Sequence, residues 1–227
     1  DGRYYVQAQR QLEGSSIELM RMGSEGVPDI FEYCRSRLGK GKKIGFDGRC
    51  LEAKQGIALR NAAYDSGSEC DYEFNAIEKI YTGRAEFPHS KAYYLDEKYS
   101  GENIADKLAK IRKLMKKEGA DCHITATLDD ICWLFNIRGN DVVYNPVIMS
   151  YAYVTDKCAY LFADKDRFSD EIIEKLQKDG VTLKPYEEFY DFLDTIEEKV
   201  ILVDMKRINY CAYKKICNCG VETVKTL

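Results

Sequence analysis

Residues 128–151, LDDICWLFNIRGNDVVYNPVIMSY, form the most distinctive stretch of the sequence. A short apolar segment, predicted to be helical, leads into an Arg-Gly-Asn-Asp loop at residues 138–141. A Tyr-Asn-Pro corner at residues 144–146 follows, and then an apolar segment predicted to be a buried strand. The stretch contains Trp133, the only tryptophan of the chain. This irregular mixture of polar and apolar residues indicates a specialised loop.

Four polar side chains bracket this loop, those of Arg138, Asp141, Asn145 and Tyr151. In one interpretation they fix the loop through hydrogen bonds. In the other they form a wall that faces a ligand or a partner domain. A buried Arg–Asp pair is costly unless it is fully satisfied, so such a pair usually has a positional role. The residues alone leave both interpretations open.

Composition excludes several classes of protein. The chain has 227 residues, 45% of them hydrophobic, which is enough to bury a sizeable core. Its net charge of −4 and pI of about 5.4 argue against nucleic-acid binding, which needs a basic surface. No apolar run approaches the roughly 20 residues that span a bilayer, so no membrane partner is expected. Nine scattered cysteines indicate a reducing, cytoplasmic environment.

Predicted strands and helices alternate along most of the chain, which indicates an α/β fold with a mixed sheet. Residues 83–100 have no clear period, contain Pro88, and are predicted to include a linker. The predicted strands are 17–22, 43–47, 122–125, 147–155, 158–162, 182–183, 200–203 and 223–226. The predicted helices are 28–38 (with Pro28 in its first turn), 51–64, 104–118 (ended by Gly119), 128–135 (N-capped by Thr127), 169–179, 186–196 and 209–217.

The residues offer little for catalysis. A metal-dependent hydrolase needs clustered histidines and carboxylates, but the chain has two histidines, His89 and His123, far apart in sequence. Asp129 and Asp130 are adjacent on a predicted helix and do not share one face. Phosphate-loop, dinucleotide-binding and Gly-x-Ser-x-Gly motifs are absent from the sequence. Cys217 and Cys219 could hold a soft metal only with further ligands.

Four stretches carry a family resemblance: residues 1–8 (DGRYYVQA), 44–47 (IGFD), 95–101 (LDEKYSG) and 128–151. They occur in the same order as in the N-terminal part of Xaa-Pro aminopeptidases and run over almost the whole of this chain. The sequence therefore resembles that family, which belongs to the creatinase/prolidase superfamily. The resemblance implies an α/β fold of creatinase/prolidase N-terminal type, with a ribonuclease H-like motif and a mixed sheet flanked by helices. It implies one partial copy at residues 1–85, a linker at 86–98 and one complete copy at 99–227.

The resemblance also implies what the parent enzyme does. Such enzymes cleave the bond after an N-terminal residue when proline is second, using two divalent metal ions, usually manganese, in a catalytic domain that this chain lacks. The chain itself is expected to hold no catalytic or metal-binding residue. Its copies are expected to shape the substrate cleft, contact the catalytic domain and support a homodimer. Arg3 of the DGRY motif is the residue that the family places at bound peptide.

Two interpretations of the function remain, part of an enzyme and a binding module. The first is a non-catalytic N-terminal portion of a cytoplasmic Xaa-Pro aminopeptidase, which the start at Asp1 and the end just after a new predicted strand favour. The second is a stand-alone binding or regulatory module that has the same fold and no catalysis. A third interpretation is a thiol–metal protein built on Cys217 and Cys219.

Overall fold

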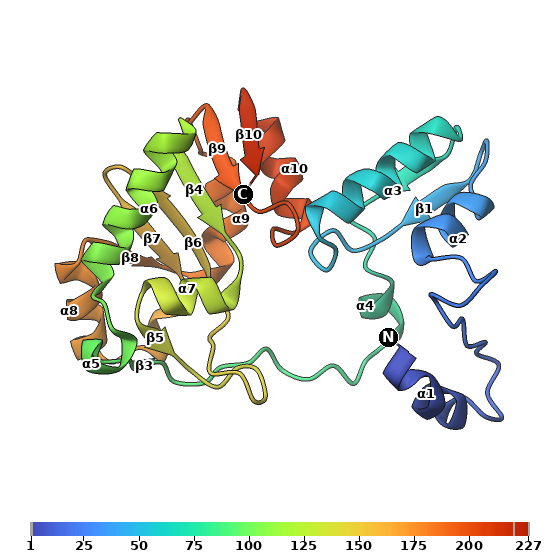
Figure 1. Ribbon diagram of the computed structural model, residues 1–227, viewed down its shortest axis with the longest axis horizontal. Helices are drawn as coiled ribbons and strands as arrows, with labels where there is room; N and C mark the ends of the chain where they lie inside the picture. Colours follow the sequence, from blue (N-terminus) through green and yellow to red (C-terminus); the bar gives the residue numbers. More distant parts are fainter. Residues whose placement is uncertain (1, 220, 227) are drawn as a thin grey trace.

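The computed structural model describes residues 2–219 and 221–226. In this part of the chain, six strands form one sheet in the order β10-β9-β4-β6-β7-β8, and two smaller sheets pair β1 with β2 and β3 with β5 (Figure 1). The strands are β1 Lys43–Gly45, β2 Glu69–Asp71, β3 Tyr93–Tyr94, β4 Cys122–Thr125, β5 Ile137–Arg138, β6 Tyr151–Thr155, β7 Ala159–Phe162, β8 Val181–Lys184, β9 Val200–Val203 and β10 Thr223–Thr226. The helices are α1 Tyr5–Gln11, α2 Ile30–Arg37, α3 Ala53–Asp65, α4 Ala76–Ile80, α5 Glu97–Ser100, α6 Ile104–Glu118, α7 Leu128–Leu134, α8 Asp170–Lys178, α9 Phe189–Leu193 and α10 Tyr210–Asn218, with 3₁₀ turns η1 Gly2–Tyr4, η2 Lys165–Arg167 and η3 Tyr186–Glu188.

The six-stranded sheet is mixed, as predicted. Strand β4 is parallel to β9 and antiparallel to β6, while β7 pairs antiparallel with β6 and parallel with β8. Successive residues of β6 alternate between two hydrophobic clusters: Ala152 and Val154 belong to one, and Tyr153 belongs to the other. Because alternate residues of a strand point to opposite faces, the sheet is covered on both sides. The first cluster includes residues of α6, α7 and α8, and the second includes residues of α9 and α10.

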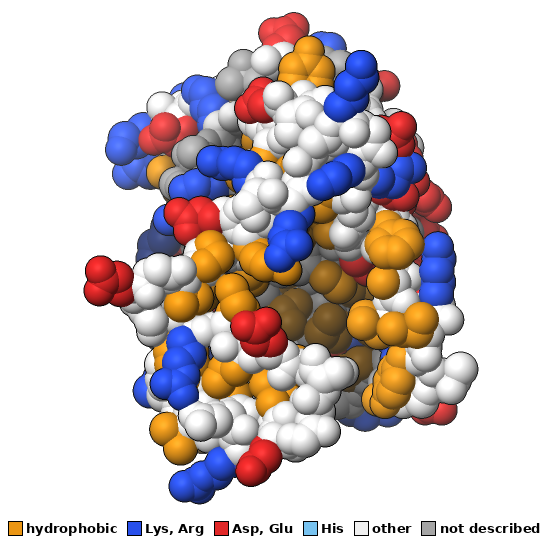
Figure 2. Space-filling model, turned by 90° about the vertical axis from the view of Figure 1, so that its right-hand side faces the viewer, with side chains coloured by type: hydrophobic (Ala, Val, Ile, Leu, Met, Phe, Trp, Pro, Cys, Tyr) orange, Lys and Arg blue, Asp and Glu red, His pale blue; other side chains and the backbone are white. Residues whose placement is uncertain are grey.

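Residues 2–85, here called the N-terminal unit, build only the two-stranded β1–β2 sheet with α1 to α4. Several of its apolar side chains are exposed, including Ile17 at 64%, Ile30 at 64% and Met22 at 47%. Figure 2 shows hydrophobic side chains gathered around a hollow on this side of the molecule. Two-stranded sheets are marginal by themselves, so the N-terminal unit depends on its contact with residues 99–219 and 221–226, here called the C-terminal unit.

That contact, here called the seam, is built around Tyr210 at the start of α10. Its ring is fully buried and packs edge-on against Phe46 and Tyr72 of the N-terminal unit, at centroid distances of 5.5 and 5.4 Å. Gly56 of α3 makes room for this ring, because a Cβ at Gly56 would lie 2.3 Å from it. Backbone hydrogen bonds cross the seam as well, from Ala53 N to Ile208 O, Lys54 N to Met205 O, Tyr210 N to Leu51 O and Cys211 N to Gly48 O.

The sequence predicted the C-terminal unit better than the N-terminal unit. Helix α6 and strands β4, β9 and β10 have the predicted bounds, and Gly119 ends α6 in the left-handed conformation at φ 61°. The predicted strand at 17–22 was wrong, because these residues are irregular and partner no strand in the described chain. Strand β2 was not predicted. The strand expected from residue 147 begins at Tyr151, since residues 147–150 belong to the loop described below.

Three helix predictions also need correction. Helix α2 begins at Ile30 rather than at Pro28, because the Asp29 side chain caps it and Glu32 returns a hydrogen bond to the Asp29 backbone. Thr127 occupies the N-cap position of α7 without a side-chain capping bond. The helix predicted at 186–196 is a 3₁₀ turn followed by α9, which ends at Leu193.

Gly56→Ala tests the seam. The added methyl group would collide with the Tyr210 ring, so we expect the free energy of unfolding to fall by about 1–3 kcal/mol. Gly39→Ala is the control, because a Cβ there meets nothing within 4 Å. Urea denaturation of both variants, followed by circular dichroism, measures the effect. Equal stabilities of the two variants would show that Gly56 is not needed for the fit.

Candidate functional site

The Arg-Gly-Asn-Asp loop and its continuation, residues 138–150, are here called the braced loop. Strand β5 leads into it and pairs antiparallel with β3, so residues 93–94 of the predicted linker lie against its start. Gly139 is required at the turn, because a Cβ there would come within 2.3 Å of the Ile148 side chain. The loop therefore folds back tightly on itself before it reaches β6.

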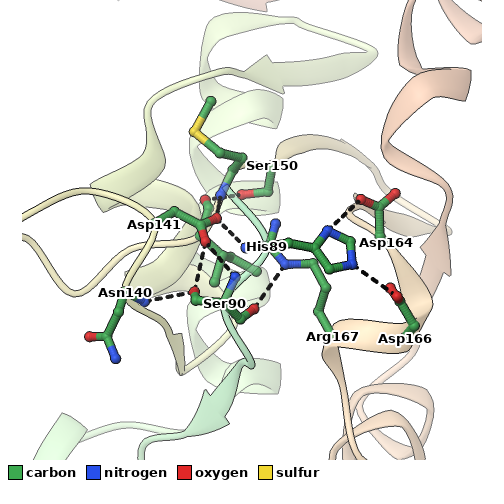
Figure 3. Close-up of polar contacts among 10 residues, drawn as sticks. His89, Ser90, Asn140, Asp141, Ser150, Asp164, Asp166 and Arg167 are labelled. Carbon is green, nitrogen blue, oxygen red and sulfur yellow. Dashed lines mark hydrogen bonds and ion pairs between the residues drawn. The ribbon is translucent and has the colours of Figure 1, made fainter. Parts of the chain in front are cut away.

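The Asp141 carboxylate holds the base of the braced loop (Figure 3). It accepts hydrogen bonds from Ser90 N at 3.1 Å, Ser90 Oγ at 2.7 Å and Met149 N at 2.6 Å, and it forms an ion pair with Arg167. The side chains of Asp141 and Arg167 are 0% and 1% exposed. Arg167 Nε also donates to Ser90 O at 3.1 Å. One buried carboxylate thus joins three segments that are distant in sequence.

This environment changes how Asp141 titrates. Burial alone would raise the pKa of its carboxyl group, but the hydrogen bonds from Arg167, Ser90 and Met149 outweigh burial and lower the pKa below its ordinary value. Asp141 is therefore charged at neutral pH, as its ion pair with Arg167 requires. Because a charged group is stable in the interior only when it is paired, the two residues depend on each other.

Arg138 makes hydrogen bonds to backbone carbonyl groups at the start of the braced loop. It does not pair with Asp141; its Nη1 donates to Cys132 O at 2.5 Å and to Ile137 O at 2.8 Å. These carbonyl groups lie at the end of α7 and in the strand that follows, so Arg138 stabilises the turn between them. Helix C-termini leave carbonyl groups without partners within the helix, and a cation there is favourable.

The turn after α7 is held from its other side by Lys107 of α6. This fully buried lysine donates from Nζ to Trp133 O at 2.7 Å and to Asn136 Oδ1 at 2.5 Å, and Nζ lies 4.5 Å from the centre of the Trp133 ring. Burial lowers the pKa of Lys107. Asn136 adopts φ 50°, a left-handed conformation that asparagine tolerates. No sequence pattern marked Lys107, because it resembles the other lysines of an amphipathic helix.

The tip of the braced loop is exposed. Asn145 N donates to Val142 O at 3.1 Å, which closes a turn, and Asn145 Nδ2 donates to Asp129 Oδ1 at 3.1 Å. Tyr144 has φ 64° and is fully exposed, and Val143 is 78% exposed. Asn145 therefore ties the turn to α7, and two apolar side chains project from a fixed base.

Tyr151 does not join this group. It begins β6, and its ring stacks on Phe189 with centroids 3.8 Å apart and an interplanar angle of 5°. Its hydroxyl lies 3.3 Å from those of both Tyr186 and Tyr190. The structure thus brings Arg138, Asp141 and Asn145 together in one loop and places Tyr151 beside the second hydrophobic cluster.

Arg3 lies in the N-terminal unit, in the 3₁₀ turn η1, where its residue is exposed and its guanidinium lies 6.0 Å from the Tyr4 ring. Residue 1 of the DGRY motif is outside the described residues. Figure 1 places this end of the chain away from β5, so Arg3 and the braced loop are separate features.

No group of three or more His, Cys, Asp or Glu residues within 2–219 and 221–226 has a geometry that could hold a metal ion. His123 Nδ1 donates to Leu202 O at 2.9 Å, and the His89 ring bonds to Asp166 at 2.9 Å, as Figure 3 shows. The Cys219 thiol bonds to the carbonyl groups of Leu193 and Lys215, and burial raises its pKa. The described residues therefore do not fit a di-metal centre.

Asp141→Asn tests the brace. It leaves the Arg167 guanidinium buried without a charged partner, so we expect a loss of about 3–5 kcal/mol in the free energy of unfolding. Asp129→Asn is the matched control and should change stability by less than about 1 kcal/mol. Urea denaturation followed by Trp133 fluorescence measures both variants. If Asp141→Asn proves as mild as the control, the ion pair does not brace the loop.

The effect of Asp141 should also depend on pH. Because its pKa is lowered in the folded protein, its contribution is fully present above the unfolded value of about 3.9. That contribution is lost as pH falls through the lower folded pKa. We therefore expect the stability difference between the wild type and Asp141→Asn to be constant from pH 7 to about pH 5 and to shrink below about pH 4. A difference that grows on acidification would contradict this assignment.

Comparisons with known proteins identify the fold. Residues 83–226 match the family model described as Creatinase/Prolidase N-terminal domain. The chain is 33% identical over 205 residues to "Probable Xaa-Pro aminopeptidase P" of Leptosphaeria maculans, covering 90% of this chain and 34% of that protein. It is 32% identical over 203 residues to "Xaa-Pro aminopeptidase 1" of Dictyostelium discoideum, covering 85% of this chain and 32% of that protein. The chain thus spans about a third of these relatives.

A solved structure, the X-prolyl aminopeptidase of Caenorhabditis elegans, matches the whole chain with a TM-score of 0.91 and 25% identity, over 38% of its own length. That protein is described as a cytosolic enzyme with a di-nuclear active site. Within the described residues, none of the helices combines the length and apolar character that a membrane span requires. The family model, the mixed sheet and the shared architecture establish that this chain belongs to the Creatinase/Prolidase N-terminal domain family.

Proposed function

We propose that this chain is the non-catalytic N-terminal part of a Xaa-Pro aminopeptidase. The observation that carries the proposal is the match of the whole chain to 38% of an X-prolyl aminopeptidase structure at a TM-score of 0.91. The sequence identities of 32–33% to Xaa-Pro aminopeptidases agree with it. Residues 1–85 would then be the end of a first creatinase-type domain, residues 86–98 a connection, and residues 99–227 a second domain.

The reaction would take place outside this chain. The bond before proline is a tertiary amide without an N–H group, so peptidases that recognise that hydrogen fail on it. In the parent enzyme two divalent metal ions, which we expect to be manganese, would supply a metal-bound nucleophile and stabilise the oxyanion. Because the described residues do not fit such a centre, we assign it to the remaining two thirds of the protein.

The braced loop suits a contact with that catalytic domain. Its base is fixed by the buried Asp141–Arg167 pair, while Val143 and Tyr144 project from its tip. An exposed apolar tip on a rigid base resembles an interface anchor, since little conformational entropy is lost when it binds. Arg138, Asp141 and Asn145 would then support the tip, and they would not themselves contact substrate.

Arg3 is proposed as the residue of this chain that contacts the peptide substrate. It is an exposed cation, and a guanidinium can pair with a peptide carboxylate or carbonyl group. We further propose that the parent enzyme is a cytoplasmic homodimer. The Caenorhabditis elegans relative is described as cytosolic, which supports the location but not the dimer.

The test compares two polypeptides: the 227-residue chain and the complete natural reading frame. With manganese added, the complete protein should cleave an Arg-Pro-Pro peptide after its first residue, and the 227-residue chain should not. A natural reading frame that ends at Leu227 would instead support a stand-alone binding module. Turnover by the pure 227-residue chain would contradict the proposal directly.

In the complete protein, Arg3→Ala should lower kcat/KM by about tenfold, the equivalent of one charge-assisted hydrogen bond. Metal content, measured by elemental analysis, should not change, and Arg3→Lys should recover part of the activity. Arg10→Ala, on the neighbouring helix α1, is the control and should behave like the wild type. Loss of metal in Arg3→Ala would mean that Arg3 has a structural role.

A further inference from the structure

A cleft lies where the two units meet. Strands β4 and β9 are parallel neighbours in the sheet. From β4 the chain goes on to β6, on the side away from β9, whereas from β9 it goes on through α10 to β10, on the side away from β4. In open α/β sheets such a switch point opens a crevice outside the carboxyl ends of the strands, and ligands bind there. At this position the structure has a cleft of about 310 Å³, here called the seam cleft, which residues 49–52 of the N-terminal unit also line.

The seam cleft has an excess of positive charge. Arg49 from the N-terminal unit and Arg207 from the loop after β9 both line it, whereas Glu52 is its only acidic lining residue among those described. The Arg49 guanidinium lies 4.5 Å from the centre of the Tyr190 ring, which orients it. Arg207 is exposed, and its side chain makes no hydrogen bond or ion pair with the described residues. Its hydrogen-bond donors are therefore available to a ligand.

A chain of hydroxyl groups adds a further donor. Asn209 Nδ2 donates to Tyr190 Oη at 2.9 Å, and the hydroxyl groups of Tyr190 and Tyr151 lie 3.3 Å apart, in a hydrogen bond in which either group can be the donor. Tyr186 Oη also donates to Tyr151 Oη, at 3.3 Å. When Tyr190 is the donor, Tyr151 accepts from both neighbours, and its own hydrogen can be donated to a ligand. Burial raises the pKa of Tyr151, so it keeps that hydrogen and can donate it into the seam cleft that it lines.

We propose that the seam cleft binds a small oxyanion, a carboxylate or a phosphate, held by Arg49, Arg207 and the Tyr151 hydroxyl. The planar fork of guanidinium donors matches the oxygen atoms of such groups, and a neutral hydroxyl completes the set. Since Arg49 and Arg207 belong to different units, the bound anion would also strengthen the seam. This site is independent of the aminopeptidase proposal.

The larger groove of the C-terminal unit is a poorer candidate. It has a volume of about 1300 Å³ and lies near the start of β4, at the other end of the sheet. Four basic side chains line it, and four acidic ones balance them: Arg112, Lys113, Lys116 and Lys157, and Asp121, Asp156, Glu197 and Glu198. This groove therefore has no excess charge that would select an anion.

Nuclear magnetic resonance tests the site. Sodium phosphate and sodium acetate are each added to the labelled 227-residue chain at constant ionic strength, because salt screens weak charge interactions. We expect one of them to shift the resonances of residues 49, 151 and 207 in a saturable way. Saturation by acetate alone identifies a carboxylate site, and saturation by phosphate alone identifies a phosphate site.

Variants sharpen the test. Arg207→Gln should raise the Kd about tenfold, and Tyr151→Phe should raise it severalfold while keeping the ring stacked on Phe189. Arg35→Gln removes the same charge from α2, outside the seam cleft, and should leave the Kd unchanged. The backbone spectrum of each variant reports whether it is folded. No saturable shift with either anion, or an equal loss in Arg35→Gln, would overturn the proposal.

Discussion

The buried ion pair between Asp141 and Arg167 organises the braced loop and the segments that meet at its base. It fixes the base of the braced loop. The Asp141 carboxylate also accepts hydrogen bonds from Ser90, in the segment that connects the two units, and from the backbone of Met149, which precedes β6. Desolvating two charges is unfavourable, and here the hydrogen bonds to the carboxylate compensate for it. An apolar core could have stabilised the domain as well, so the pair is best understood as a device that sets the position of one loop.

The two units differ in how much hydrophobic core each buries by itself, and one contact joins them. The C-terminal unit buries hydrophobic clusters on both faces of a six-stranded sheet, whereas the N-terminal unit has only two paired strands. Their contact rests on the Tyr210 ring in the space that Gly56 leaves. The N-terminal unit is therefore ordered by its contacts across the seam, and residues of both units shape the seam cleft.

Sequence reasoning predicted what local patterns determine. The apolar stripe and terminal glycine of α6, and the fully apolar strand β9, were found at their predicted positions. It failed where a partner is distant in sequence: Ser90 and Arg167 lie 51 and 26 residues from Asp141, and nothing near them marks the contact. Residues 17–22 alternate like a strand, but a strand also needs a neighbour, and no described strand pairs with them. Arg138 was expected either to fix the loop or to face a ligand or partner domain, and its hydrogen bonds to Cys132 O and Ile137 O are local ones.

Hydrogen exchange at single amides tests whether Asp141 makes the braced loop a rigid support. The amides of Ser90 and Met149 donate to Asp141, and the amide of Asn140 donates to Ser90 Oγ, whereas Val143 lies at the exposed tip. If the account is correct, the first three exchange as slowly as the amides of β4 although they lie outside the strands, and Val143 exchanges freely. Exchange of Ser90, Met149 and Asn140 at the rate of Val143 would contradict it.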